Sequence, residues 1–502
     1  MNIQQAKEQI SNAMRAYFSK DEFGNYLIPI ERQRPVYLLG APGIGKTAIM
    51  AQIARELNVG LVSYSMTHHT RQSAIGLPYI VNKEYKGEEF TVSEYTLSEI
   101  IASVYEMIEK SGHDEGILFL DEINCVSETL TPAILQFLQY KIFGKHQIPQ
   151  GWIVVTAGNP AEYNRSVHDF DIATWDRLKR IDVEPDFEIW KEYALCQGVH
   201  PSIITYLEIR PSDFYKIETT VDGKTFVTAR GWDDLSQMIS LYEMNDIRVD
   251  NLLVSQYLQN PEIAKRFAVY YDLFNKYKND YNVEAILDGH DTQAIADRAE
   301  AAAFDERISF IALIVDALNT RMRAHLINAQ CNEIIFGHLS AIKLEHADAD
   351  GFLADCRSHC EERAQTMLVT INKERSLQAI SKDDYISKKR AVEFLESLAF
   401  SVEALSFDDA RAQFYARLEE EEREEKELSL QLERALTFIE DLFGESQEQL
   451  LMITDLSSSA YSMKFINEYG SEGYFKAAKR LQFHERGADM LERIAQLEAS
   501  EG

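Results

Sequence analysis

The sequence predicts an α/β fold with a parallel β-sheet, followed by a long, mainly α-helical region. An apolar segment at residues 35–39 precedes a glycine-rich segment, 40–47, and apolar residues at helical spacing follow it. Two further apolar segments, 116–120 and 152–157, lead into polar side chains, as buried strands do where a parallel sheet faces a ligand. Residues 250–502 are predicted to be mainly α-helical, because they show helical periodicity and contain no recognisable chemical motif.

The glycine-rich segment has the pattern G-x-x-x-x-G-K-[ST] of a phosphate-binding loop. Between a strand and a helix, such a loop directs backbone N–H groups and the positive end of the helix dipole toward one point, which suits a polyphosphate. Lys46 is predicted to reach the outer phosphates, and the Thr47 hydroxyl to bind Mg²⁺. The residues predicted to contact the nucleotide are Gly40, Ala41, Pro42, Gly43, Ile44, Gly45, Lys46, Thr47 and Ala48.

Acidic and amide side chains follow the next two predicted strands. Asp121 is placed to hold Mg²⁺ through its water shell, and Glu122 to polarise an attacking water. Two adjacent acids favour hydrolysis, because one handles the metal and the other the nucleophile. Gly158-Asn159-Pro160 alone is typical of a turn. After the two preceding motifs, however, Asn159 is predicted to lie beside the γ-phosphate, where its amide can orient the water.

In the order of these three motifs, residues 30–245 resemble the AAA+ ATPases, and in detail the MoxR branch. The resemblance implies an α/β P-loop AAA+ core with a small helical lid, and ATP and Mg²⁺ as cofactors. The choice of ATP over GTP rests on the resemblance alone. The chain departs from the branch at Cys125-Val126, where Arg-Ala is usual, and at Ala229, where proline is usual. The motifs that carry the resemblance are Asp121-Glu122-Ile123-Asn124 (D-E-I-N), Gly158-Asn159-Pro160 (G-N-P), Asp176-Arg177-Leu178 (D-R-F/L) and Thr228-Ala229-Arg230 (S-P-R).

The resemblance also implies a ring-shaped homo-oligomer, a hexamer, with arginines near each nucleotide. It implies that Arg177 or Arg180 reaches the γ-phosphate of a neighbouring subunit, and that Arg230, on the lid, acts on the nucleotide of its own subunit. The alternative for Arg177 and Arg180 is surface pairing with nearby acids, such as Asp176 and Asp182.

Turn residues and changes of sequence pattern divide the chain into four predicted regions. Hairpins are expected at 79–92, 143–149 and 221–225; the resemblance implies that the first two face the pore of the ring, and the alternative is ordinary surface hairpins. A long helix near 407–443 carries an acidic run, which is either a solvated helix face or an acidic docking surface. The regions are an N-terminal helical segment (1–30), the nucleotide-binding α/β domain (31–182), a helical lid (183–249) and a helical extension of unknown role (250–502).

Composition limits the function classes. The chain has 502 residues and a net charge of −30, from 51 basic and 81 acidic residues. Because DNA affinity comes mainly from Lys and Arg side chains that neutralise phosphates, this negative charge disfavours binding to nucleic acid and to anionic membrane surfaces. Five cysteines do not form a disulfide framework, and Cys356 and Cys360 are expected to be reduced helix residues. The longest apolar run, 308–315, is too short to span a bilayer, and a cytoplasmic protein is expected.

Two functions from different classes remain open. The first is an ATP-driven remodeller of a protein partner. The MoxR resemblance implies that this partner carries a von Willebrand A-type domain. The second is a nucleic-acid-directed motor or loader, which the net charge disfavours. A nucleotide-binding scaffold with little turnover is disfavoured because Glu122 and Asn159 are both present.

Overall fold

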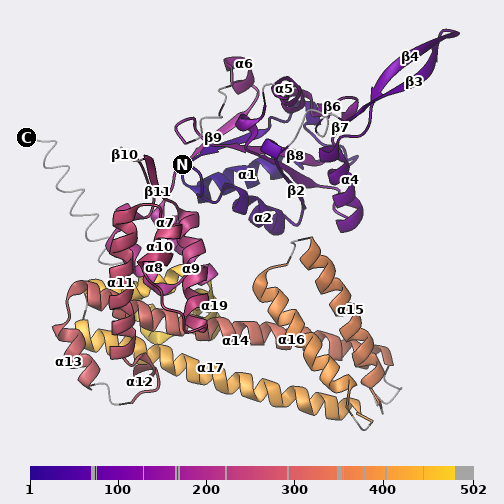
Figure 1. Cartoon of the computed structure of the whole chain (residues 1–502). Coiled ribbons are helices and arrows are strands. Elements are labelled where there is room, and N and C mark those ends of the chain that lie inside the picture. The colour runs from indigo at the N-terminus through magenta and orange to yellow at the C-terminus, as the bar shows by residue number, and fades with distance from the viewer. Residues whose placement is uncertain are drawn as a thin grey trace, which may run out of the picture. The chain divides into compact units, whose positions relative to one another are not determined.

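The computed structural model describes most of the chain as two compact units (Figure 1). The first unit comprises Met1–Trp190 and Phe214–Asp234, and the second comprises Lys191–Asp213 and Leu235–Gly502. The structure describes residues 1–480 except 69–73, 75, 128, 164–166, 168–169, 221–222, 291–292, 347–352, 354, 378–379, 402–403 and 445.

A parallel five-stranded sheet forms the centre of the first unit, with strand order β2-β5-β8-β1-β9. The three apolar segments predicted as strands are β1, β5 and β8, which are neighbours in this order. Their carboxyl ends therefore meet at one edge of the sheet, where a ligand binds in open α/β folds. The strands are β1 (Val36–Gly40), β2 (Gly60–Ser65), β5 (Gly116–Asp121), β8 (Trp152–Gly158) and β9 (Lys179–Val183).

Helices cover both faces of the sheet because successive side chains of a strand point to opposite faces. In β5, Ile117 and Phe119 are buried in a cluster with α1 and α2, whereas Leu118 and Leu120 are buried in another with α4 and α5. The prediction of an α/β core is therefore confirmed, and the helix predicted within residues 1–30 is α1. The helices are α1 (Ile3–Tyr17), α2 (Lys46–Leu57), α4 (Glu99–Ser111), α5 (Thr131–Tyr140) and the short α6 (Ile172–Trp175).

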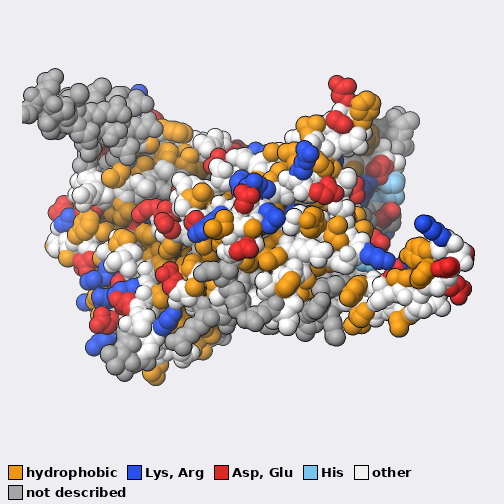
Figure 2. Space-filling view, turned by 90° about the horizontal axis from the view of Figure 1, so that it is seen from above, with side chains coloured by type: hydrophobic (Ala, Val, Ile, Leu, Met, Phe, Trp, Pro, Cys, Tyr) orange, Lys and Arg blue, Asp and Glu red, His pale blue; other side chains and the backbone are white. Residues whose placement is uncertain are grey.

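Three hairpins are added to this core. The first projects from the unit, and hydrophobic side chains lie along it (Figures 1 and 2). Its turn residues Lys86 and Gly87 both have positive φ, as the tight turns of two-residue hairpins require. Val221 and Asp222, which the sequence places at the turn of the third hairpin, lie outside the described residues. The hairpins are β3 (Pro78–Tyr85) with β4 (Glu88–Tyr95), β6 (Ile142–Phe143) with β7 (His146–Gln147), and β10 (Lys216–Thr220) with β11 (Gly223–Val227).

The described residues of the second unit are mainly helical. Two long helices, α14 and α17, join two hydrophobic cores: one includes α18 and α19, and the other includes α15 and α16. The helix predicted near 407–443 is α17. The helices are α7 (Phe187–Gln197), α8 (Pro201–Ile209), α9 (Ala229–Met244), α10 (Asn251–Tyr257), α11 (Pro261–Asp280), α12 (Val283–Leu287), α13 (Gln293–Ala301), α14 (Phe304–His346), α15 (Arg357–Ser376), α16 (Lys382–Ala399), α17 (Phe407–Phe443), α18 (Gln447–Ser458) and α19 (Ala460–Tyr469), of which α7 and α9 begin in the first unit.

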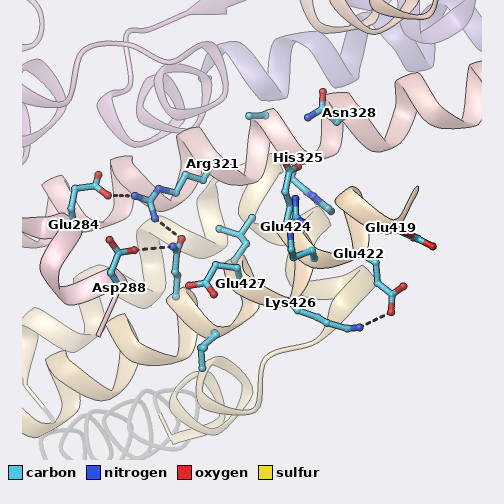
Figure 3. A pocket seen from close by; sticks show the side chains of 15 residues that line it. Glu284, Asp288, Arg321, His325, Asn328, Glu419, Glu422, Glu424, Lys426 and Glu427 are labelled. Carbon is cyan, nitrogen blue, oxygen red and sulfur yellow. Dashed lines mark hydrogen bonds and ion pairs between the residues drawn. The ribbon is translucent and has the colours of Figure 1, made fainter. Parts of the chain in front are cut away.

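The acidic run of α17 lies between the two cores and lines a cavity of about 940 Å³ together with α12 and α14 (Figure 3). Within the run, Arg423 pairs with Glu420 at 3.2 Å and Lys426 with Glu422 at 2.5 Å. All four side chains are exposed, as predicted for a solvated helix face with local ion pairs. Whether the run also serves as an acidic docking surface stays a prediction.

Three further observations concern the cysteines, metal sites and membrane-spanning helices. Cys356 and Cys360 are free and buried in the core that contains α15 and α16. The described part of the chain contains no group of three or more His, Cys, Asp or Glu side chains arranged to hold a metal ion. None of its helices is both long enough and apolar enough to cross a membrane.

Candidate functional site

The glycine-rich loop connects β1 to α2 and depends on its glycines. Gly43 and Gly45 have φ values of 74° and 93°, in the left-handed region that L side chains rarely adopt. At Gly40, a Cβ atom would lie 2.6 Å from the carbonyl oxygen of Val183 in β9. The chain thus turns sharply into α2, whose first N–H groups lack helical partners and form an anion-binding terminus.

Lys46, the first residue of α2, is 8% exposed. Its Nζ donates to the carbonyl oxygens of Gly40 and Ala41, both at 2.8 Å, and to Oδ1 of Asn159 at 2.9 Å. Burial lowers the pKa of Lys46 to about 8, although the nearby carboxylate of Asp121 opposes the shift. The structure therefore brings the loop lysine and the predicted γ-phosphate residue into direct contact.

The two residues predicted to hold magnesium also meet. The Thr47 hydroxyl donates to Oδ2 of Asp121 at 2.8 Å, which joins the start of α2 to the carboxyl end of β5. Hydroxyl and carboxylate oxygens are hard ligands, of the kind that Mg²⁺ prefers. Together with a buried ammonium at a helix N-terminus, this donor set fits a magnesium–triphosphate complex.

Glu122 follows directly and has a φ of 55°, in the left-handed region. Its Oε2 accepts hydrogen bonds from the hydroxyls of Ser65 and Thr67, each at 3.1 Å. Neither hydroxyl was predicted to belong to the site. The available signal was the strand-like run 61–65, which ends at Ser65. In the structure this run is β2, which lies beside β5 with Ser65 in register with Asp121.

A second asparagine positions Asn159. The side chain of Asn124, which is buried, donates to the backbone carbonyl of Asn159 at 2.8 Å. The preceding Gly158 leaves no room for a side chain, because a Cβ there would lie 2.2 Å from the Tyr37 hydroxyl and 2.5 Å from the Asn124 amide oxygen. The D-E-I-N segment thus holds both the predicted catalytic acid and the backbone of Asn159.

The three predicted arginines lie in different places. The backbone N–H of Arg230 donates to the carbonyl of Gly43 at 3.2 Å, so this residue lies against the loop. The side chain of Arg177 is exposed, donates to the carbonyl of Ala173 at 3.0 Å, and lines a separate cavity with α5. Arg180 pairs with Asp182 at 2.8 Å, and its guanidinium lies over the ring of Trp175. The surface pair expected as the alternative for Arg180 is therefore present.

Residues 35–178 match the family model of the AAA domain, dynein-related subfamily. This part of the chain is an AAA domain. The chain is therefore an ATPase, since the AAA domain family implies ATP hydrolysis with bound ATP and magnesium. AAA proteins commonly form oligomers. The match includes the phosphate loop, Asp121, Glu122 and Asn159, and ends before Arg230 and the helical region. No curated protein matches the sequence.

Proposed function

We propose that this chain is a MoxR-type AAA+ ATPase that assembles into a ring in the cytoplasm and uses ATP hydrolysis to remodel or activate a protein partner. The observation that carries the nucleotide site is the meeting of three distant segments. Lys46 bonds to Asn159 over 113 residues, and Thr47 bonds to Asp121 over 74 residues. The MoxR-like motifs and the net charge of −30 support a protein partner rather than nucleic acid.

Each residue of the site has a role in this proposal. The loop from Gly40 to Ala48 surrounds the phosphates with N–H groups, and Lys46 adds a buried cation. Thr47 and Asp121 hold the magnesium ion, which neutralises phosphate charge when bound. Glu122 polarises the attacking water and Asn159 orients it.

The arginines divide between the two sides of a subunit interface. Arg230 lies against the loop of its own subunit and senses the nucleotide bound there. The hydrogen bond of Arg177 is with α6 and the ion pair of Arg180 is with β9, not with the loop of the same subunit, which supports action on a neighbouring subunit. A planar guanidinium suits the charge that spreads over the phosphoryl oxygens.

The nucleotide site is tested by Lys46→Ala. Losing a charged hydrogen bond costs about 1.5–3 kcal/mol, so ATP affinity falls by at least about tenfold in a calorimetric titration. Lys110→Ala, which removes an exposed lysine paired with Glu106 on α4, serves as the control and leaves affinity unchanged. An unchanged affinity of Lys46→Ala overturns the site.

The ring is tested by mixing two inactive variants. Glu122→Gln keeps ATP binding and loses turnover, and Arg177→Ala or Arg180→Ala is expected to do the same from the other side of the interface. An arginine of this kind contributes about 10³–10⁵ in rate. Mixing the two variants restores activity only if one interface then carries a complete site. The ring is contradicted if the activity per subunit is independent of protein concentration down to the monomer and neither arginine substitution changes it.

The partner is tested by measuring ATP turnover with a purified von Willebrand A-type domain encoded near this chain, and with duplex and single-stranded DNA in parallel. Stimulation by the protein domain and none by DNA is the expected result. Stimulation by DNA alone would replace the proposal with a nucleic-acid-directed motor or loader.

A further inference from the structure

An anion-binding loop needs its N–H groups turned toward the anion and its carbonyl groups turned away. In this protein, four successive carbonyl oxygens of the phosphate loop are each held by a donor. Lys46 is one donor, and the other two come from a distant segment that begins at Phe214. The hydrogen bonds are Lys46 Nζ to Gly40 O and to Ala41 O (both 2.8 Å), Tyr215 Oη to Pro42 O (2.9 Å), and Arg230 N to Gly43 O (3.2 Å).

Tyr215 is fixed by its buried neighbour. Phe214 packs with its ring 5.6 Å from that of Phe187 and 5.1 Å from that of Trp190. The indole N–H of Trp232, which is fully buried, donates to the carbonyl of Phe214 at 3.0 Å. A tyrosine hydroxyl is protonated at neutral pH and can donate, and burial raises the pKa of Tyr215 further.

The segment after the third hairpin lies directly against the loop. A Cβ atom at Gly43 would be 3.0 Å from both Cβ and Oγ1 of Thr228, and 3.4 Å from Cβ of Arg230. Gly43 therefore allows the close approach of this segment as well as the left-handed backbone. The Pro42 and Gly43 carbonyls are both held from this side of the loop.

The same hairpin also reaches the turn that follows Asn159. Lys224, near the turn of β10 and β11, donates to the backbone carbonyl of Glu162 at 2.6 Å. Glu162 is three residues beyond Asn159. The hairpin thus bonds the phosphate loop at its base and the chain that follows Asn159 near its turn.

We propose that Tyr215 and the β10–β11 hairpin are positioning elements for the nucleotide. Tyr215 turns the Pro42 carbonyl away from the phosphates, so that the loop N–H groups face them. Lys224 holds the backbone that leads away from Asn159, and with it the amide that orients the water. This inference rests on the proposed nucleotide site; neither residue is assigned contact with the nucleotide.

The test of Tyr215 is Tyr215→Phe, which removes only the hydroxyl. We expect the KM for ATP and the Kd for ADP to rise by about 2- to 12-fold, the change that corresponds to one hydrogen bond, with kcat within about twofold of the wild type. AMP, which places no β-phosphate in the loop, is expected to lose less affinity than ADP. Tyr26→Phe is the matched control, because the Tyr26 hydroxyl donates to Glu115 at 3.1 Å and not to the loop.

The test of the hairpin is Lys224→Met, with Lys216→Met as the control. Lys216 lies on the same hairpin and pairs with Glu218 of its own strand at 3.0 Å. Lys224→Met is expected to lower kcat by about 2- to 12-fold, the effect of one hydrogen bond near Asn159, while KM stays unchanged and Lys216→Met behaves as the wild type.

Wild-type ADP affinity in Tyr215→Phe, or an equal loss for AMP and ADP, overturns the role of Tyr215. Wild-type kcat in Lys224→Met overturns the role of the hairpin. Lys224 is exposed, so this second variant remains informative if Tyr215→Phe does not fold. Lys46→Ala separates the two levels of the argument: if it weakens ATP binding and Tyr215→Phe does not, the nucleotide site stands and only this inference fails.

Discussion

Nucleotide binding should be accompanied by proton uptake at Lys46. The pKa of this side chain is about 8, lowered mainly by burial and further by Arg230, and opposed by Asp121 and Glu122. A bound triphosphate adds negative charge beside Nζ and raises the pKa again. The protein therefore takes up a proton whenever Lys46 was neutral before binding.

The size of the effect follows from the pKa. With a value of about 8, roughly one tenth of Lys46 is neutral at pH 7, half at pH 8 and nine tenths at pH 9, so uptake at pH 8 is about 0.5 proton. The terminal phosphate contributes little there, because its second pKa is about 6. Lys46→Arg is the matched variant, since a guanidinium stays protonated throughout this range.

The measurement is calorimetric titration with ADP in two buffers that differ in heat of ionisation, at pH 7, 8 and 9. The dependence of the observed enthalpy on the buffer gives the number of protons taken up. We expect uptake to increase with pH in the wild type and to be absent in Lys46→Arg. No uptake at pH 8 and 9, or equal uptake in both proteins, would refute the reasoning.

Three further predictions concern the supports of the site and of the helical unit. Ser65→Ala combined with Thr67→Ala removes two hydrogen bonds to Glu122, each worth about 0.5–1.5 kcal/mol. The double variant should raise the kcat for ATP hydrolysis measured without a partner, with little change in KM. An unchanged kcat would show that the two hydroxyls do not restrain Glu122. Gly158→Ala should lower the free energy of unfolding by about 1–3 kcal/mol in urea, whereas Gly337→Ala, in open space on α14, should raise it by about 0.5–1 kcal/mol. Lys191→Met should destabilise the second unit by about 3–5 kcal/mol, since it leaves Glu208 and Asp455 buried without their cation, and adding Glu208→Gln and Asp455→Asn should recover most of the loss.

Much of the core was predictable because the relevant signals are local. A continuous apolar run such as 116–120 is typical of a strand buried on both faces, and all of its residues are buried. The bounds of α17 were predictable because helical periodicity continues up to Gly444, where the helix ends. The meeting of Thr47 with Asp121 follows from the same logic, since the carboxyl ends of parallel strands share one edge.

The rest depends on tertiary contacts that local patterns do not encode. Ser65 and Thr67 are ordinary hydroxyl residues until β2 pairs with β5 and brings them to Glu122. Tyr215 reaches Pro42 over 173 residues, and its position depends on the packing of Phe214 and the bond from Trp232. The sequence pattern predicts that the hairpin exists. That Tyr215, which precedes it, reaches the carbonyl of Pro42 is decided by this packing.

The contacts of Lys46 also connect phosphate binding to the amide of Asn159. An ammonium group has three protons, and Gly40, Ala41 and Asn159 accept all three. A phosphate oxygen that bonds to Nζ must therefore replace one of these acceptors. The carbonyls of Gly40 and Ala41 can leave only if the backbone of the loop moves, whereas the Asn159 side chain can turn about its own bonds. If the outer phosphates bind to Nζ as proposed, their binding is the event that frees this amide, and the group proposed to orient the water then becomes available when the substrate is in place.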